Sequence, residues 1–235
     1  MSKLSKSAGA SLERYLRHWR ERGALMTLPE QNGQTLPITI AVSQECGVNG
    51  RGIAKAIGQQ LDWPVYDREL VEMISEDTGV HTHLLDSIDE KSPHWLAECL
   101  DTFQQEKTIS GSGYAIRLIK VLFALSGHGN CVVMGRGAAQ VLPVKQTLRV
   151  RLVAPLAERI TEIQQQKEMS YKEAKKHIEE VDKERAAFVK GYFHKDVSDP
   201  HGYDLLANSL RIGIDQTAKL ILLAQKYFTD SLMKK

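Results

Sequence analysis

The chain has 235 residues, 42% of them hydrophobic and 26% charged, which is typical of a soluble globular protein with one domain, or one domain and an inserted lid. A formal net charge of +2 is too small to indicate nucleic-acid binding. Cys46, Cys99 and Cys131 lack CxxC spacing, which argues against a zinc site or disulfide framework and favours a reducing, cytoplasmic environment. We expect no secretory signal and no transmembrane segment, since no apolar run is long enough.

Residues 1–36 form a basic N-terminal extension, with six Lys or Arg residues against three Glu. Within it, residues 11–22 carry apolar side chains at helical spacing from Leu12 to Trp19, with arginines on the other face. This amphipathic helix is expected to dock on the chain's own core or on a second copy, which makes it a candidate contact of a homo-oligomer. Binding to a membrane surface or to another partner is the alternative.

The next segment predicts a strand at 38–42, a glycine-rich loop, and a helix at 52–61. This order points backbone N–H groups and the positive end of a helix toward a phosphate, although an ordinary turn is the alternative. Arg51 is the only cation of the loop. The candidate phosphate cradle consists of Gly47, Asn49, Gly50 and Gly52.

The rest of the chain alternates strand and helix patterns. Strands are expected at 63–67, 131–134, 148–153 and 203–207. Helices are expected at 69–77, 114–125, 155–190 and 213–229. Ser170, three residues before Glu173, predicts a capping box where the third of these helices is interrupted. The alternation predicts an α/β fold of three layers, whose parallel sheet binds ligands beyond the carboxyl ends of its strands.

Two charged residues follow predicted strands at that edge. Asp67 can hold Mg²⁺ through water or accept a hydroxyl proton, with an exposed turn residue as the alternative. Arg136 lies between two glycines, where packing explains an arginine poorly and an anionic ligand explains it well. Cys46 lies near the start of a helix, which is expected to lower the pKa of its thiol.

The charged segment at about 155–195 predicts a helical lid. Asp182 and Arg185 lie three residues apart on one helical face, and Lys183 and Arg159 add positive charge. Such a lid can close cations over a transferring phosphate and exclude water. A solvated helix with internal ion pairs is the alternative.

Six motifs occur in order along residues 38–210: ITIAVSQECGVNGRGIAKAIG, PVYDRELVEMI, NCVVMGRGAAQVLP, RVRLVAPLAERI, DKER and DPHGYDLLANS. Together they resemble the cytidylate kinase-like family of P-loop proteins, relatives of the bacterial cytidylate kinases. The resemblance implies a P-loop NTPase domain at 37–230, with the lid described above. It also implies ATP as phosphate donor with Mg²⁺, and a nucleoside monophosphate such as CMP or dCMP as acceptor.

The same resemblance assigns roles by position. The loop from Gly47 to Gly52, including Val48, would bind the ATP phosphates. The implied catalytic residues are Arg51, Asp67, Arg136, Arg159 and Arg185. The implied acceptor contacts are Arg136, Asp67 and Lys183, and Asp67 would also hold the metal through water.

The chain departs from the cytidylate kinases at four positions. Gly50 and Gly52 stand where those enzymes have the loop Lys and the metal-binding hydroxyl, which weakens ATP and Mg²⁺ binding. Met134 and Gly137 stand where they have two acids, which weakens the case for CMP. We expect an ATP-dependent phosphotransferase. The alternatives are a nucleotide-binding regulatory or interaction protein without turnover, and a kinase for a non-nucleotide small molecule.

Overall fold

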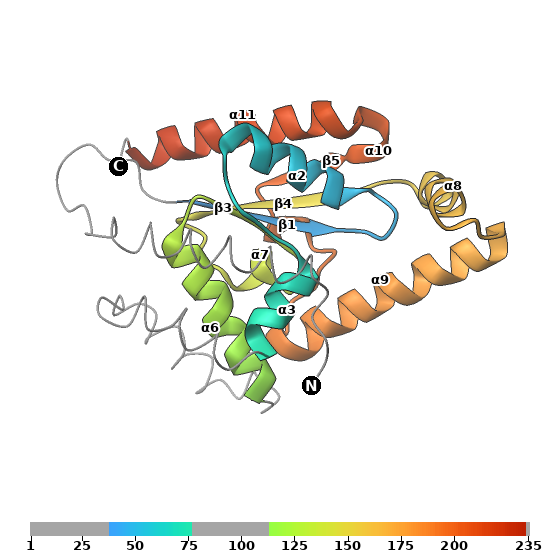
Figure 1. The fold of residues 1–235 in the computed structure, drawn as a ribbon, viewed down its shortest axis with the longest axis horizontal. Coiled ribbons are helices and arrows are strands. Elements are labelled where there is room, and N and C mark those ends of the chain that lie inside the picture. Colours follow the sequence, from blue (N-terminus) through green and yellow to red (C-terminus); the bar gives the residue numbers. More distant parts are fainter. Residues whose placement is uncertain (1–37, 77–112, 234–235) are drawn as a thin grey trace, which may run out of the picture.

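The structure, a computed structural model, describes residues 38–76 and 113–233 of the chain. A five-stranded sheet with the order β2-β3-β1-β4-β5 lies at its centre, and every neighbouring pair is parallel (Figure 1). The strands are β1 (Thr39–Gln44), β2 (Val65–Tyr66), β3 (Cys131–Met134), β4 (Thr147–Val153) and β5 (Leu205–Asn208). Because β1 is the middle strand, the loop that follows it lies between the carboxyl ends of β3 and β4.

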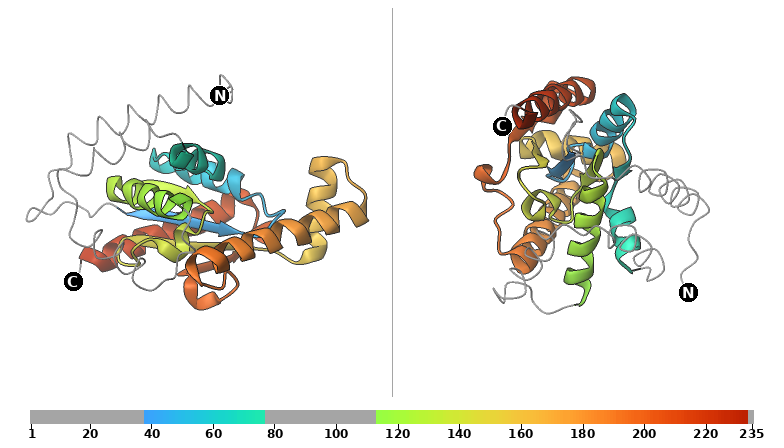
Figure 2. Two further views of the ribbon diagram at one scale, coloured as in Figure 1. Left: turned by 90° about the horizontal axis from the view of Figure 1, so that it is seen from below. Right: turned by 90° about the vertical axis from the view of Figure 1, so that its left-hand side faces the viewer.

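Helices cover both faces of the sheet (Figures 1 and 2). One face carries α2 (Gly50–Leu61), α10 (Ser209–Ile212) and α11 (Ile214–Met233). The other face carries α3 (Arg68–Glu76), α6 (Gly113–His128) and α7 (Ala138–Val141). The single turn η1 (Pro200–Gly202) precedes β5.

The alternation of side chains along the strands separates two apolar cores. Ile40 and Val150 lie in the core beneath α2 and α11, whereas Ala41 belongs to the core on the opposite face. On β4 the same alternation turns Arg149 and Arg151 away from the α2 side. Two arginines of a central strand therefore lie on the face that carries α3 and α7.

Two further helices, α8 (Leu156–Lys167) and α9 (Tyr171–Phe193), project beyond the sheet as a pair (Figure 2). A small apolar cluster joins them to the loop after β1, and it includes Cys46, Ile160 and Ile178. The predicted capping box at the start of α9 is confirmed, because Ser170 and Glu173 each bond the other's backbone N–H. The carboxyl end of α9 returns to the sheet.

The predicted α/β fold with a parallel sheet covered on both faces is confirmed. Strand β2 is shorter than expected, since Pro64 has no N–H group to extend the ladder. The four-residue helices α7 and α10 were not predicted, because such short segments show no periodicity. The predicted N-terminal helix at 11–22 lies outside the described residues. None of the helices that the structure describes is both long and apolar enough to span a membrane.

Candidate functional site

The loop after β1 has a backbone suited to binding an anion. Gly47 has φ of 89° and Asn49 has φ of 49°, so the chain turns sharply before α2 begins. The Asn49 side chain accepts a hydrogen bond from the Gly52 N–H and caps α2. Within the described ranges, no protein acceptor bonds the N–H groups of residues 47–51. These donors, at the positive end of α2, are available to a phosphate.

The side chain of Gln44 packs against Gly50. A Cβ on Gly50 would lie 2.8 Å from Cδ of Gln44 and 3.2 Å from Cδ1 of Leu152. The Oε1 atom of Gln44 is buried against this glycine and has no hydrogen-bond partner in the described part of the chain. A lysine at position 50 is incompatible with this position of Gln44. A side chain at position 50 would therefore require the end of Gln44 to move.

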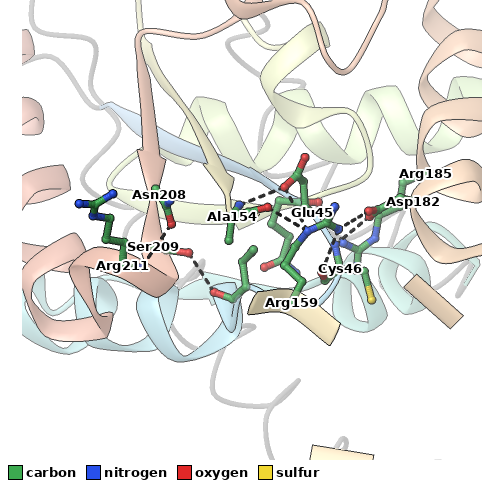
Figure 3. A network of polar contacts seen from close by, with 11 residues as sticks. Glu45, Cys46, Ala154, Arg159, Asp182, Arg185, Asn208, Ser209 and Arg211 are labelled. Atoms are coloured by element: carbon green, nitrogen blue, oxygen red, sulfur yellow. Dashed lines mark hydrogen bonds and ion pairs between the residues drawn. The ribbon is translucent and has the colours of Figure 1, made fainter. Parts of the chain in front are cut away.

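Side chains of α8 and α9 hold the loop (Figure 3). Asp182 accepts a hydrogen bond from the Cys46 N–H at 2.8 Å, and Arg159 donates to the Cys46 carbonyl at 3.2 Å. Arg159 also pairs with Asp182 at 2.5 Å and donates to the Ala154 carbonyl at 3.1 Å. With only 8% of its surface exposed, Arg159 is a buried cation held by two carbonyls and two carboxylates, Asp182 and, at 3.5 Å, Glu45. It fixes the loop backbone.

Arg185 makes a second contact between α9 and the loop. Its Nη1 donates to the Gln44 carbonyl at 2.9 Å. Burial lowers the pKa of its guanidinium below the ordinary value, and the neighbouring Arg68 and Arg151 lower it further. Asp182 and Arg185, predicted to share a helical face, thus both contact the loop.

The thiol of Cys46 is chemically protected rather than activated. Burial raises its pKa above the ordinary value and outweighs the opposing effect of Arg185. The expected lowering by the helix terminus was wrong, because desolvation of the thiolate is the largest effect at this position.

Arg51 points toward α3 rather than toward the loop. Its Nη2 lies 2.9 Å from Oδ2 of Asp67 and also pairs with Glu69. The other oxygen of Asp67 accepts the N–H of Leu70 at 3.0 Å and caps α3. Because the Arg51 side chain is 65% exposed, water screens these pairs, and the arginine can turn to a phosphate at little cost.

Arg136 follows β3 with a left-handed φ of 51°. Its guanidinium pairs with Glu72 of α3 and lies 4.9 Å from the ring centroid of Phe188. Burial, followed by repulsion from Arg68, lowers its pKa to about 10, so it stays charged at neutral pH. Its Nε is buried and bonds no acceptor among the described residues, which leaves one donor for a ligand.

A cavity of about 430 Å³ opens at the carboxyl ends of β1 and β3, next to α3 and α9. Its wall contains five arginines and three carboxylates. The arginines are Arg51, Arg68, Arg136, Arg151 and Arg185, and the carboxylates are Asp67, Glu69 and Glu184. The excess of positive charge suits an anionic ligand.

The model of the cytidylate kinase-like family matches residues 39–211, which include both the loop and the cavity. The chain belongs to the cytidylate kinase-like family. Membership in this family supports a kinase-like phosphotransferase that binds a nucleotide.

Solved structures also resemble this member of the cytidylate kinase-like family. An uncharacterized protein from Eubacterium ventriosum matches with a TM-score of 0.65 and 19% identity, over 83% of this chain and 99% of that one. Shikimate kinase from Bacteroides thetaiotaomicron matches with a TM-score of 0.45 and 13% identity, over 81% of this chain and 99% of that one. No curated protein matches the chain significantly. The first likeness shows a shared fold.

Four of the predicted site residues of this cytidylate kinase-like protein line the cavity. They are Arg51, Asp67, Arg136 and Arg185. The other two predicted cations do not line it, since Arg159 is buried against the loop and Lys183 is exposed on α9. Val48 and the glycines form the loop itself, where the Val48 carbonyl accepts a hydrogen bond from Ser209.

Sequence reasoning missed Arg68 and Arg151. Arg151 had a usable signal, because the apolar residues of β4 alternate with Arg149 and Arg151. An arginine in a buried parallel strand is costly and indicates a partner or a ligand. Arg68 had no such signal, since it is an exposed residue that directly follows Asp67 at the start of α3.

Proposed function

We propose that the chain is an ATP-dependent phosphotransferase whose acceptor is a small phosphorylated molecule, with a nucleoside monophosphate such as CMP or dCMP as the first candidate. The observation that carries this proposal is the set of free N–H groups at residues 47–51 beside an arginine-lined cavity. A donor phosphate at the loop and an anionic acceptor in the cavity would meet at the same edge of the sheet. In-line transfer requires such an arrangement.

Phosphoryl transfer depends on positioning and charge neutralisation more than on covalent chemistry. In our proposal the backbone of residues 47–51 holds the donor phosphates. Arg51 turns from its exposed carboxylates to the transferring group, and Arg185 neutralises charge from the side of α9. Arg136 anchors the acceptor through its free Nε.

The residues present fit a magnesium ion that enters with the nucleotide. Mg²⁺ usually binds one or two carboxylates, while phosphate oxygens and water complete its coordination. Asp67 and Glu69 supply two carboxylates at the cavity, both paired with Arg51. The part of the chain that the structure describes holds no cluster of three or more metal-ligating side chains. Asp67 and Glu69 would hold the ion through water, and the ion would neutralise phosphate charge.

The test is ADP release by the full chain from MgATP with CMP, dCMP, UMP, AMP or GMP. We expect ADP with at least one acceptor and a fall in kcat/KM of about tenfold or more in Arg51→Gln, which removes a charge-assisted hydrogen bond. Lys55→Gln is the control, because Lys55 is exposed one turn further along α2. Equal rates of ADP release by wild type and Arg51→Gln with every acceptor would sink the proposal.

A nucleotide-binding protein without turnover is the second candidate. The loop sequence favours it, since Gly50 supplies no lysine to the phosphates and Gly52 supplies no hydroxyl to a metal. ATP calorimetry separates the two candidates. Affinity that is unchanged by removal of Mg²⁺ and by Asp67→Asn, without ADP release, supports the second. Affinity that requires both supports the first.

A further inference from the structure

Arg151 is a buried cation without a carboxylate. The residue is 8% exposed, its Nη1 donates to Oγ of Ser43 at 2.7 Å, and its guanidinium carbon lies 5.9 Å from the ring centroid of Tyr203. Within residues 38–76 and 113–233, no acid lies within ion-pair distance of it. Buried charges in proteins are normally paired, because an unpaired one loses its hydration without compensation.

The same strand satisfies its other arginine. Arg149, two residues earlier and on the same face, donates to Asp204 from Nε at 3.1 Å and from Nη2 at 2.7 Å. This hydrogen bonding raises the pKa of Arg149. Arg136 likewise has Glu72. Arg151, which lines the cavity, therefore lacks the carboxylate partner that Arg149 and Arg136 have.

Ser43 lies beside Arg151 at the end of β1 and also lines the cavity. Its Oγ accepts the hydrogen bond from Arg151. The hydroxyl of Tyr203 donates to the same Oγ at 3.3 Å and also faces the Val197 carbonyl at 2.8 Å. The Ser43 O–H is left as a donor next to the remaining N–H groups of Arg151. A guanidinium and a hydroxyl that both donate match the oxygens of a phosphate or a carboxylate.

A second cation reinforces the positive charge here. Arg185 faces the same cavity and, in the described residues, forms no ion pair. Burial lowers the pKa of its guanidinium, and repulsion by Arg68 and Arg151 lowers that pKa further. An anion next to Arg151 would relieve the desolvation of the buried Arg151 and the half-buried Arg185, as well as their mutual repulsion.

We propose that Arg151 and Ser43 form an oxyanion subsite on the sheet side of the cavity, which binds an anionic group of the acceptor, separate from the donor phosphates at the glycine loop. The group is a phosphoryl or a carboxylate oxyanion. Its assignment to the acceptor rests on the proposed function, whereas anion binding itself requires no turnover. The acceptor is then selected by its charge as well as by its shape.

The test is calorimetric binding of inorganic phosphate to the full chain, at an ionic strength held constant with sodium chloride. Arg151→Gln should weaken binding about tenfold or more, because charge-assisted hydrogen bonds are lost. Arg149→Gln is the matched control, with the same strand, face and charge change, and should stay within about twofold of wild type. Acetate in a second titration identifies the group. Equal affinities indicate a carboxylate subsite, and tighter phosphate binding indicates a phosphoryl subsite.

Three results overturn the proposal. The first is that the wild-type protein binds no anion. The second is that binding is unchanged in Arg151→Gln, which would assign the anion to the glycine loop. The third is that Arg151→Gln and Arg149→Gln weaken binding equally. If Arg151→Gln does not fold, Ser43→Ala decides, since it should weaken binding severalfold and unchanged binding would overturn the subsite. ADP release is a separate readout. Phosphate binding that depends on Arg151, without ADP release, would support the subsite and contradict the kinase proposal. ADP release with phosphate binding that does not depend on Arg151 would support the kinase proposal and contradict the subsite.

Discussion

Replacing Gly137 by Ala should destabilise the fold more than the same change at Gly135. Gly137 has φ of 73°, and an added Cβ would lie 2.6 Å from Cδ2 of Phe193 and closer still to Cε2. Phe193 is 3% exposed and belongs to the core on the α7 side of the sheet. Its ring cannot withdraw from the new methyl group without displacing other buried side chains.

Two costs add at Gly137. The left-handed conformation costs an L-residue about 1–2 kcal/mol, and an extra methyl group in a packed core costs about 1–3 kcal/mol. We therefore expect Gly137→Ala to lower the free energy of unfolding by about 2–5 kcal/mol. Gly135 has φ of 71°, but no atom lies within 4 Å of its added Cβ. Gly135→Ala should lose only the conformational cost, about 1–2 kcal/mol.

Urea denaturation followed by circular dichroism measures both variants, and each kcal/mol also lowers Tm by about 2–4 °C in a protein of this size. Phe193→Leu in the Gly137→Ala background tests the contact, because a smaller side chain should return part of the loss and make the double variant less than additive. The steric explanation is refuted if the two alanine variants lose the same stability.

Two further predictions concern α9. Asp182→Asn should destabilise the chain by about 2 kcal/mol in chemical denaturation, because the buried Arg159 loses its shorter ion pair and keeps only Glu45 at 3.5 Å. Glu180→Gln at an exposed pair should cost less than about 0.5 kcal/mol. Hydrogen bonds from Ser170 hold the pKa of Glu173 below its ordinary value. This carboxylate stabilises α9 above its unfolded-state pKa and loses that contribution as the pH falls through the lower folded-state pKa. Glu173→Gln should flatten this acid limb in helical circular dichroism, and an unchanged acid limb would contradict it.

Features encoded by neighbouring residues could be predicted from the sequence. The capping box needs only Ser170 and Glu173, three residues apart, and it occurs as expected. Strand β1 could be predicted in the same way, since its apolar run is followed directly by the glycine-rich loop. The alternation of strand and helix patterns was enough to predict a sheet with helices on both faces, because a parallel sheet requires crossover connections.

Contacts between distant segments could not be predicted in the same way. Asp182 and Arg185 bond the loop across 136 and 141 residues, and no local spacing encodes such a pairing. Sequence reasoning treated Arg159 as a lid cation, yet it is buried against the Cys46 carbonyl. Arg149 and Arg151 share a face, and only the position of Asp204 in the fold decides which of them is neutralised.

The place of β1 has a consequence for protein synthesis. Thr39 pairs with Cys131 and with Thr147, so β1, the first of the described strands to leave the ribosome, waits for both of its neighbours. Until then its apolar side chains, Ile40 among them, have no sheet to join and present a segment prone to aggregate or to bind a chaperone. The side chains that fix the loop, Asp182 and Arg185, emerge later still. The anion-binding loop, although encoded near the start of the domain, is among the last parts of the nascent protein to assemble.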